Sequence, residues 1–104
     1  MADGWAQVLA GGPHDLHAAL LHSVHADLRA AREALDRHDA AHAAFLAHRL
    51  KGSARLMGDD SATALCTLLE AAGRAGAIEH IRSLWVQVEH AFGIALARLD
   101  DGTT

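Results

Sequence analysis

Apolar residues recur at spacings of three and four along most of the chain, which is the period of an α-helix that buries one face. The first long stripe consists of Leu16, Leu20, Val24, Leu28, Ala31 and Leu35. Two later stripes consist of Leu65, Leu68, Leu69 and Ala72, and of Ile78, Ile81, Leu84, Val88, Phe92, Ala95 and Leu99. Each stripe predicts a helix whose apolar face packs against the others.

Capping and helix-breaking residues divide this pattern into one short helix and four longer ones. Pro13 suits a first helical turn because its missing N–H is not needed there. Asp39 and residues 59–61 offer N-caps, and Gly58 and Gly76 are suitable helix ends. The predicted bounds are about 5–10 for the short helix, closed by Gly11 and Gly12, and about 13–37, 40–57, 61–75 and 77–99 for the long ones.

The connections between these helices are only a few residues long, so consecutive helices are expected to be antiparallel neighbours. Ala and Leu dominate the chain, while Pro occurs once and Tyr is absent, which favours helices over strands. The sequence therefore predicts an all-α fold: an antiparallel up-down-up-down four-helix bundle with a short extra N-terminal helix, forming one domain over residues 1–104.

Composition narrows the classes of function. The net charge of −4 offers no broad basic surface for nucleic acid. Cys66 is the only cysteine; it permits no intrachain disulfide and is expected to be a small core residue. Asp3 stands where a signal peptide needs a basic region, and no apolar run approaches the ~20 residues of a membrane span. A cytoplasmic domain without membrane contact is expected.

His48 combines an exposed position with unusual neighbours. If Leu50 marks the centre of the core-facing stripe, His48 lies about 160° away, with Gly52 and Arg55 on its side and Lys51 beside it. A neutral imidazole is a good nucleophile, and a lysine three residues on can reach the oxygens of a phosphoryl group on it. An interior helical glycine costs about 1 kcal/mol relative to alanine, so Gly52 suggests a need for access. A solvated face with a chance glycine is the alternative explanation.

A longer string of residues resembles the histidine-containing phosphotransfer (Hpt) family. The family pattern is a histidine, lysine at +3, glycine at +4, a small residue at +5 and glycine at +10, followed on the next helix by a cysteine and a Leu-Glu pair. Here these are His48, Lys51, Gly52, Ser53, Gly58, Cys66, Leu69 and Glu70. The resemblance extends over nearly the whole chain.

The resemblance implies roles for three of these side chains. His48 would be the phosphoacceptor, reacting through Nε2, and Lys51 would neutralise phosphoryl charge. Glu70 lies where many members have a polar residue that hydrogen-bonds the histidine's Nδ1, which would leave the Nε2 lone pair free. An ion pair between Glu70 and Arg74, four residues on, is an equally good explanation of Glu70.

The partner is expected to dock around Gly52. Phe45 lies about 140° from the core centre, so it is either covered by a neighbouring helix or exposed as an apolar contact for the partner. Arg55 and Arg74 either add positive potential for an acidic partner or are ordinary solvated charges.

The function that the resemblance implies is that of a phosphorelay carrier. His48 would accept a phosphoryl group from a receiver-domain aspartate and pass it to another response-regulator receiver in two-component signal transduction. The domain would have no autonomous kinase activity and no cofactor, since the receiver would hold the Mg²⁺. A monomer is expected, either stand-alone or as the C-terminal module of a hybrid sensor histidine kinase.

Two rival classes remain open. The dimerisation and phosphoacceptor domain of a histidine kinase typically has Glu or Asp after its histidine and a downstream proline, whereas Arg49 follows His48 and no proline lies beyond Pro13. A metal-binding bundle would use histidine pairs at helical spacing, of which the chain has His14/His17, His22/His25 and His38/His42. No HExxH motif occurs, and no metal site is expected.

Overall fold

The computed structural model describes residues 13–100, and helices joined by short turns account for all of them. The helices are α2 (Pro13–Asp36), α3 (Ala40–Leu56), α4 (Asp60–Arg74) and α5 (Ile78–Asp100). The all-α prediction is therefore confirmed for this part of the chain, and the four long helices begin and end close to their predicted bounds. The predicted short helix at 5–10 lies outside the described residues.

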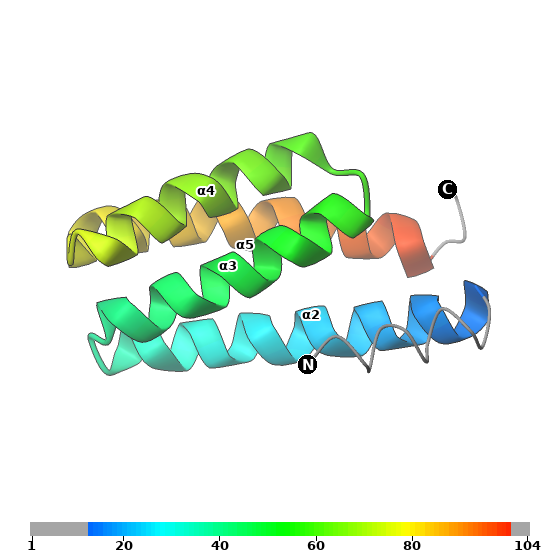
Figure 1. Cartoon of the computed structure of the whole chain (residues 1–104), viewed down its shortest axis with the longest axis horizontal. Helices are drawn as coiled ribbons and strands as arrows, with labels where there is room; N and C mark the ends of the chain where they lie inside the picture. The colour runs from blue at the N-terminus through cyan, green and yellow to red at the C-terminus, as the bar shows by residue number, and fades with distance from the viewer. Residues whose placement is uncertain (1–12, 101–104) are drawn as a thin grey trace.

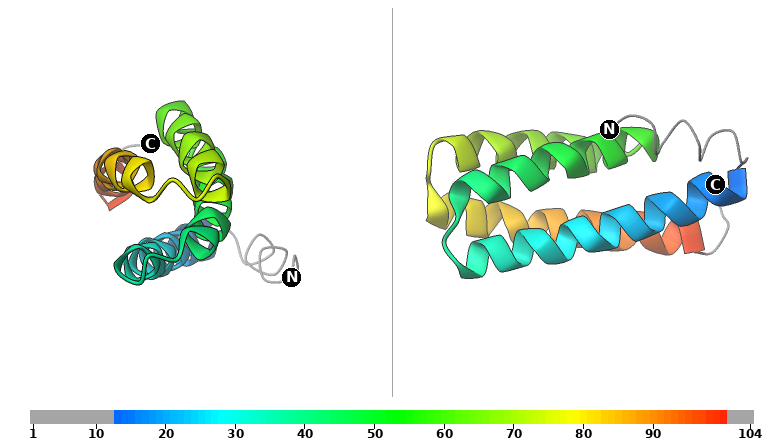
Figure 2. Two further views of the ribbon diagram at one scale, coloured as in Figure 1. Left: turned by 90° about the vertical axis from the view of Figure 1, so that its left-hand side faces the viewer. Right: turned by 60° about the horizontal axis from the view of Figure 1, so that its bottom comes forward.

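The four helices lie side by side along the long axis of the molecule (Figure 1). In the same view the chain passes along α2, returns along α3, and repeats this with α4 and α5. α3 packs against both α2 and α4, α4 packs against α5, and α2 contacts α5. The end-on and tilted views show α3 between α2 and α4 (Figure 2). α3 thus packs against α2 on one side and against α4 on the other.

The core lies along the predicted stripes, with one exception. Its largest fully buried side chains come from all four helices: Val24, Leu50, Cys66, Leu69, Ile81, Val88 and Phe92. The prediction that Leu68 faces inward is wrong, because its side chain is 52% exposed. The buried face of α4 is centred on Ala62, Cys66, Leu69 and Gly73, and Leu68 lies about 130° from that centre on a helical wheel.

Cys66 is a core residue, as predicted. It has no exposed surface, and burial raises the pKa of its thiol to about 12. A thiol with this pKa stays protonated near neutral pH, which suits packing rather than reaction.

The turns follow the capping signals. Asp39 caps α3 by accepting a hydrogen bond from the His42 backbone N–H at 3.0 Å, and Asp59 caps α4 through the Ala62 N–H at 2.9 Å. Gly58 and Gly76 follow α3 and α4 with φ of +69°, the left-handed conformation that glycine adopts without strain. Each helix therefore stops where the sequence predicts.

A close contact between α3 and α4 involves Gly73, which the sequence analysis did not single out. A Cβ at this position would lie 2.6 Å from the Ala44 Cβ and 3.0 Å from the Ala40 carbonyl oxygen. The helices approach this closely because both residues at the contact are small. Glu70 lies one turn before Gly73 and His48 one turn after Ala44, so this contact sets the distance between those two side chains.

We predict that Gly73→Ala lowers the free energy of unfolding by about 1–3 kcal/mol, because the added methyl group overpacks the contact with α3. Gly93→Ala on α5 is the matched control. A Cβ there meets nothing within 4 Å, so this variant should gain up to about 1 kcal/mol from helix propensity. Urea unfolding of both variants measures the difference, and equal stabilisation of the two would contradict a tight contact at Gly73.

Candidate functional site

His48 lies on α3 with its ring pointing away from the core. Its side chain is 67% exposed, whereas Leu50, two residues on, is fully buried. This agrees with the helical-wheel prediction, because residues that differ by about 160° on one helix cannot face the same environment. The imidazole is therefore open to a partner molecule.

The inner edge of the imidazole contacts a buried carboxylate. The Nδ1 atom of His48 lies 3.0 Å from Oε2 of Glu70, and Glu70 on α4 is one of three buried polar residues in the described chain. A carboxylate oxygen can only accept, so Nδ1 is the donor. In the neutral ring this tautomer leaves the lone pair on Nε2, at the outer edge.

Two cations share the same carboxylate. Lys51 Nζ donates to Glu70 Oε1 at 2.7 Å, and Arg74 Nη2 donates to Oε2 at 2.6 Å. Glu70 therefore makes both of the contacts considered for it, with His48 and with Arg74. The hydrogen bond from Lys51 lowers the pKa of Glu70 against the opposing effect of burial, and the hydrogen bond from His48 adds to the lowering. Glu70 is an anion at neutral pH.

The surface beside His48 is open. A Cβ on Gly52 would meet nothing within 4 Å, as the access argument predicts. Phe45 is 57% exposed, so it is not covered by a neighbouring helix. Its ring stacks on His42 with centroids 6.0 Å apart. Arg55 is exposed, and its side chain pairs with no other described residue.

Two depressions lie along α3 near the site, and His48 itself lines the first of them. The one between α3 and α4 has a volume of about 470 Å³ and is lined by Ala41, Ala44, Phe45, His48, Glu70, Gly73 and Arg74. The one between α2 and α3 has a volume of about 320 Å³ and is lined by Ser23, Asp27, Arg49, Gly52, Ser53 and Leu56. The surface of α3 in this region is therefore hollowed toward α4 beside His48 and toward α2 beside Arg49 and Gly52.

The family model for the Hpt domain matches residues 15–102. The chain belongs to the Hpt domain family. Hpt domains take part in phosphotransfer in two-component signalling, where they interact with receiver domains and act as phosphocarriers rather than catalysts. Comparison with curated proteins gave no match, and neither did comparison with solved structures.

In this Hpt domain the Lys51 side chain contacts a group that the sequence did not predict as its partner. The helical wheel predicts Lys51 beside His48, with its ammonium group able to reach a phosphoryl group on the ring. Its side chain is only 15% exposed, and Nζ is bonded to Glu70. A helical wheel for α3 cannot predict this contact because Glu70 comes from α4.

Two further residues of the Hpt domain lie beside the site, and the sequence analysis missed their pairing. Arg49 Nε donates to both carboxylate oxygens of Asp27, at 3.1 and 3.2 Å. Asp27 is an acid on the apolar stripe of α2, three residues after Val24 and four before Ala31. An acid at a core-facing position needs a partner, and this was the sequence signal that could have predicted the pair. Leu56, four residues after Gly52, is an exposed apolar residue beside the site, and the sequence pattern did not point to it.

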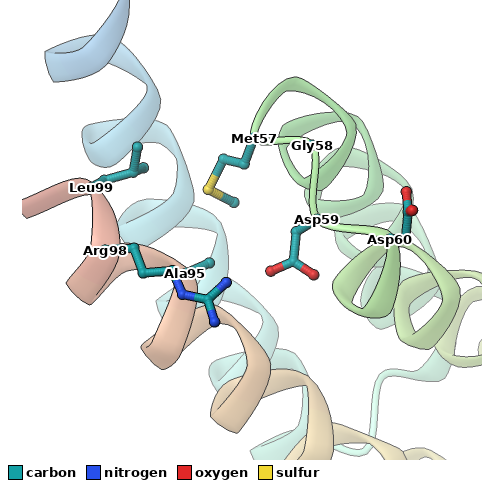
Figure 3. Close-up of a pocket in the computed structure, with 7 residues that line it drawn as sticks. All are labelled: Met57, Gly58, Asp59, Asp60, Ala95, Arg98 and Leu99. Carbon is teal, nitrogen blue, oxygen red and sulfur yellow. The ribbon is translucent and has the colours of Figure 1, made fainter. Parts of the chain in front are cut away.

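The remaining features lie outside this site. Among residues 13–100, no group of three His, Cys, Asp or Glu side chains comes together as a metal site requires. No described helix has the length and apolar character needed to cross a membrane. A depression of about 470 Å³ lies where α3 ends and α4 begins, and the Arg98 and Asp59 side chains point toward one another across it (Figure 3); His48 does not line it.

We predict a pH-dependent contribution of Glu70 to stability. Its pKa in the folded Hpt domain is below the ordinary 4.5, so its contribution is present above that pH and is lost as the pH falls through the folded pKa. The difference in unfolding free energy between the wild type and Glu70→Gln should therefore be larger at about pH 6.5 than at about pH 3.

Urea unfolding at the two pH values measures this difference. Glu33→Gln, which removes an exposed carboxylate of α2, is the control and should differ little from the wild type at either pH. A Glu70→Gln difference that stays constant between the two pH values would contradict a stabilised carboxylate.

Proposed function

We propose that this Hpt domain carries a phosphoryl group on Nε2 of His48, taken from the aspartate of one receiver domain and passed to the aspartate of another. The observation that carries the proposal is the contact between His48 Nδ1 and Glu70 Oε2 at 3.0 Å, in a ring whose outer edge is exposed. It supports the one tautomer in which Nε2 is a nucleophile.

The transfer makes one bond and breaks one bond. The Nε2 lone pair attacks the phosphorus atom, and the bond from phosphorus to the aspartyl oxygen breaks, so the receiver leaves with a free carboxylate. The Nδ1 proton stays on the ring, which therefore becomes a cation in the phosphorylated form. Glu70 stabilises this cation through the existing hydrogen bond. The reverse reaction delivers the group to the second receiver.

Lys51 and Arg74 are proposed to offset the charge of the phosphoryl group. Both cations and His48 Nδ1 share the carboxylate of Glu70, so both are held near the ring before the phosphoryl group arrives. Cations that are already in place stabilise the charge of the transferring group without reorganisation. A short movement of Lys51 Nζ from Glu70 toward a phosphoryl oxygen completes this role.

The receiver is proposed to dock over Gly52 and Phe45, with Arg55 and Arg74 toward its acidic groups. The receiver holds the Mg²⁺, and this domain contributes no cofactor and no kinase activity of its own. The proposed carrier is a monomer located in the cytoplasm. A reducing compartment fits the single buried thiol of Cys66. Its assignment as a stand-alone protein or a C-terminal module of a hybrid sensor kinase stays a prediction, as does the short N-terminal helix.

His48→Gln is expected to abolish labelling by a phosphorylated receiver, because glutamine offers no nucleophilic nitrogen. The measurement is the transfer of acid-labile phosphate from the receiver to the domain. His90→Gln, at an exposed position on α5, is the control and should be labelled like the wild type. Label retained on His48→Gln would overturn the assignment of the phosphoacceptor.

Gly52→Gln is expected to separate access from folding. The helix should be as stable as the wild type or gain up to about 1 kcal/mol, because glycine is the poorer helix former. Phosphotransfer should fall at least tenfold because the new side chain fills the space beside His48 that the aspartyl phosphate needs. Gly93→Gln makes the same change on α5, also in open space, and should transfer normally. A Gly52→Gln variant that transfers at the wild-type rate would rule out the steric role.

A further inference from the structure

The guanidinium group of Arg49 is only partly used within the domain. Its Nε donates to both oxygens of Asp27, while its two terminal nitrogens form no hydrogen bond with any described residue. The Arg49 side chain is half exposed, whereas the carboxylate of Asp27 on α2 is only 8% exposed. Asp27 therefore holds the guanidinium from below and leaves its outer edge free.

This outer edge lies at the open side of the phosphoacceptor. On the helical wheel of α3, Arg49, Gly52 and Leu56 fall within about 60° of one another, on the flank of His48 that faces α2. Arg49, Gly52 and Leu56 also line the depression between α2 and α3. The flank thus combines an open helix surface at Gly52, the exposed apolar side chain of Leu56 and the fixed cation of Arg49.

The cations around His48 differ in how available and how ordered they are. On the α4 side, Lys51 and Arg74 both donate to Glu70. Arg55 is exposed and pairs with no other described residue, so a partner that binds it must first order its side chain. Arg74 and Arg49 are each held by a buried carboxylate and can donate further hydrogen bonds, and Arg49 is the one that lies on the α2 side of His48. A guanidinium held in this way loses little entropy on binding a carboxylate.

We propose that Arg49, held by Asp27, is a specificity-determining residue that binds a carboxylate on the surface of the partner receiver, on the α2 side of His48. Asp27 is a positioning residue that acts through Arg49. The proposal rests on the proposed function. A partner carboxylate is the ligand rather than the phosphoryl group, because consecutive side chains on a helix diverge by about 100° and Arg49 is turned toward α2.

Long-range electrostatics and a positioning role for Asp27 predict opposite effects of Asp27→Asn on the affinity for the receiver. This substitution removes a negative charge from the surface that meets an acidic partner, so long-range electrostatics alone would tighten binding. If Asp27 serves to hold Arg49, the same substitution weakens binding because the guanidinium loses its fixed position. The sign of the change in affinity therefore tests the positioning role.

The experiment measures transfer from a phosphorylated receiver at increasing receiver concentrations, for the wild type, Arg49→Gln, Asp27→Asn and the double variant. Arg49→Gln should raise the half-saturating receiver concentration about tenfold, the order expected for one charge-assisted contact, and should change the maximal rate less than twofold. Asp27→Asn should raise it about threefold. The double variant, which has no buried charge left at this position, should match Arg49→Gln.

Arg32→Gln is the matched control, because it also removes one half of an arginine–carboxylate pair between helices, that of Arg32 with Glu89 on α5. Its half-saturating concentration should stay within twofold of the wild type. Phosphoramidate, a small donor that labels histidine without a receiver, should phosphorylate the wild type and Arg49→Gln at the same rate.

Three outcomes would overturn the inference: an Arg49→Gln half-saturating concentration within twofold of the wild type, tighter binding by Asp27→Asn, or slower labelling of Arg49→Gln by phosphoramidate. The last would place Arg49 on the phosphoryl group instead of on the partner. These outcomes differ from failure of the proposed function, which would be seen as label retained by His48→Gln.

Discussion

A negative charge is buried between α3 and α4, and the site depends on how that charge is compensated. An unpaired carboxylate in the interior costs several kcal/mol, so Glu70 is stable only with donors around it. It receives three, from His48 and Lys51 on α3 and from Arg74 on its own helix. The same hydrogen bonds that stabilise Glu70 orient the imidazole and hold Lys51 inward, so packing the two helices together also sets the tautomer and the position of the His48 ring.

Two glycines serve this arrangement in opposite ways. Gly73 lets α4 approach α3 until a Cβ would collide with Ala44, and this brings Glu70 within hydrogen-bond distance of His48. Gly52 leaves the outer surface of α3 empty, so a large partner can approach the ring. Each position forgoes helix propensity, one for close packing inside the bundle and the other for access from outside.

The two flanks of His48 are chemically different. On the α4 side, the cations are already bound to Glu70 and can respond to charge on the ring. On the α2 side, Asp27 holds Arg49 with its outer edge toward solvent, next to the exposed Leu56 and the open Gly52. A carrier must stabilise a transferred group and also recognise the proteins that supply and remove it. In the proposed function, the α4 side of His48 serves the first task and the α2 side serves the second.

The sequence by itself determined what depends on one helix at a time: the four long helices, the Asp39 cap, the glycine ends and the outward direction of His48. These follow from local hydrogen bonding and the helical period. Only the tertiary structure decided the contacts of Lys51 with Glu70 and of Arg49 with Asp27, the close approach at Gly73 and the exposure of Leu68. Each of these depends on how one helix is rotated and placed against another, and the periodicity of a single helix does not contain that rotation.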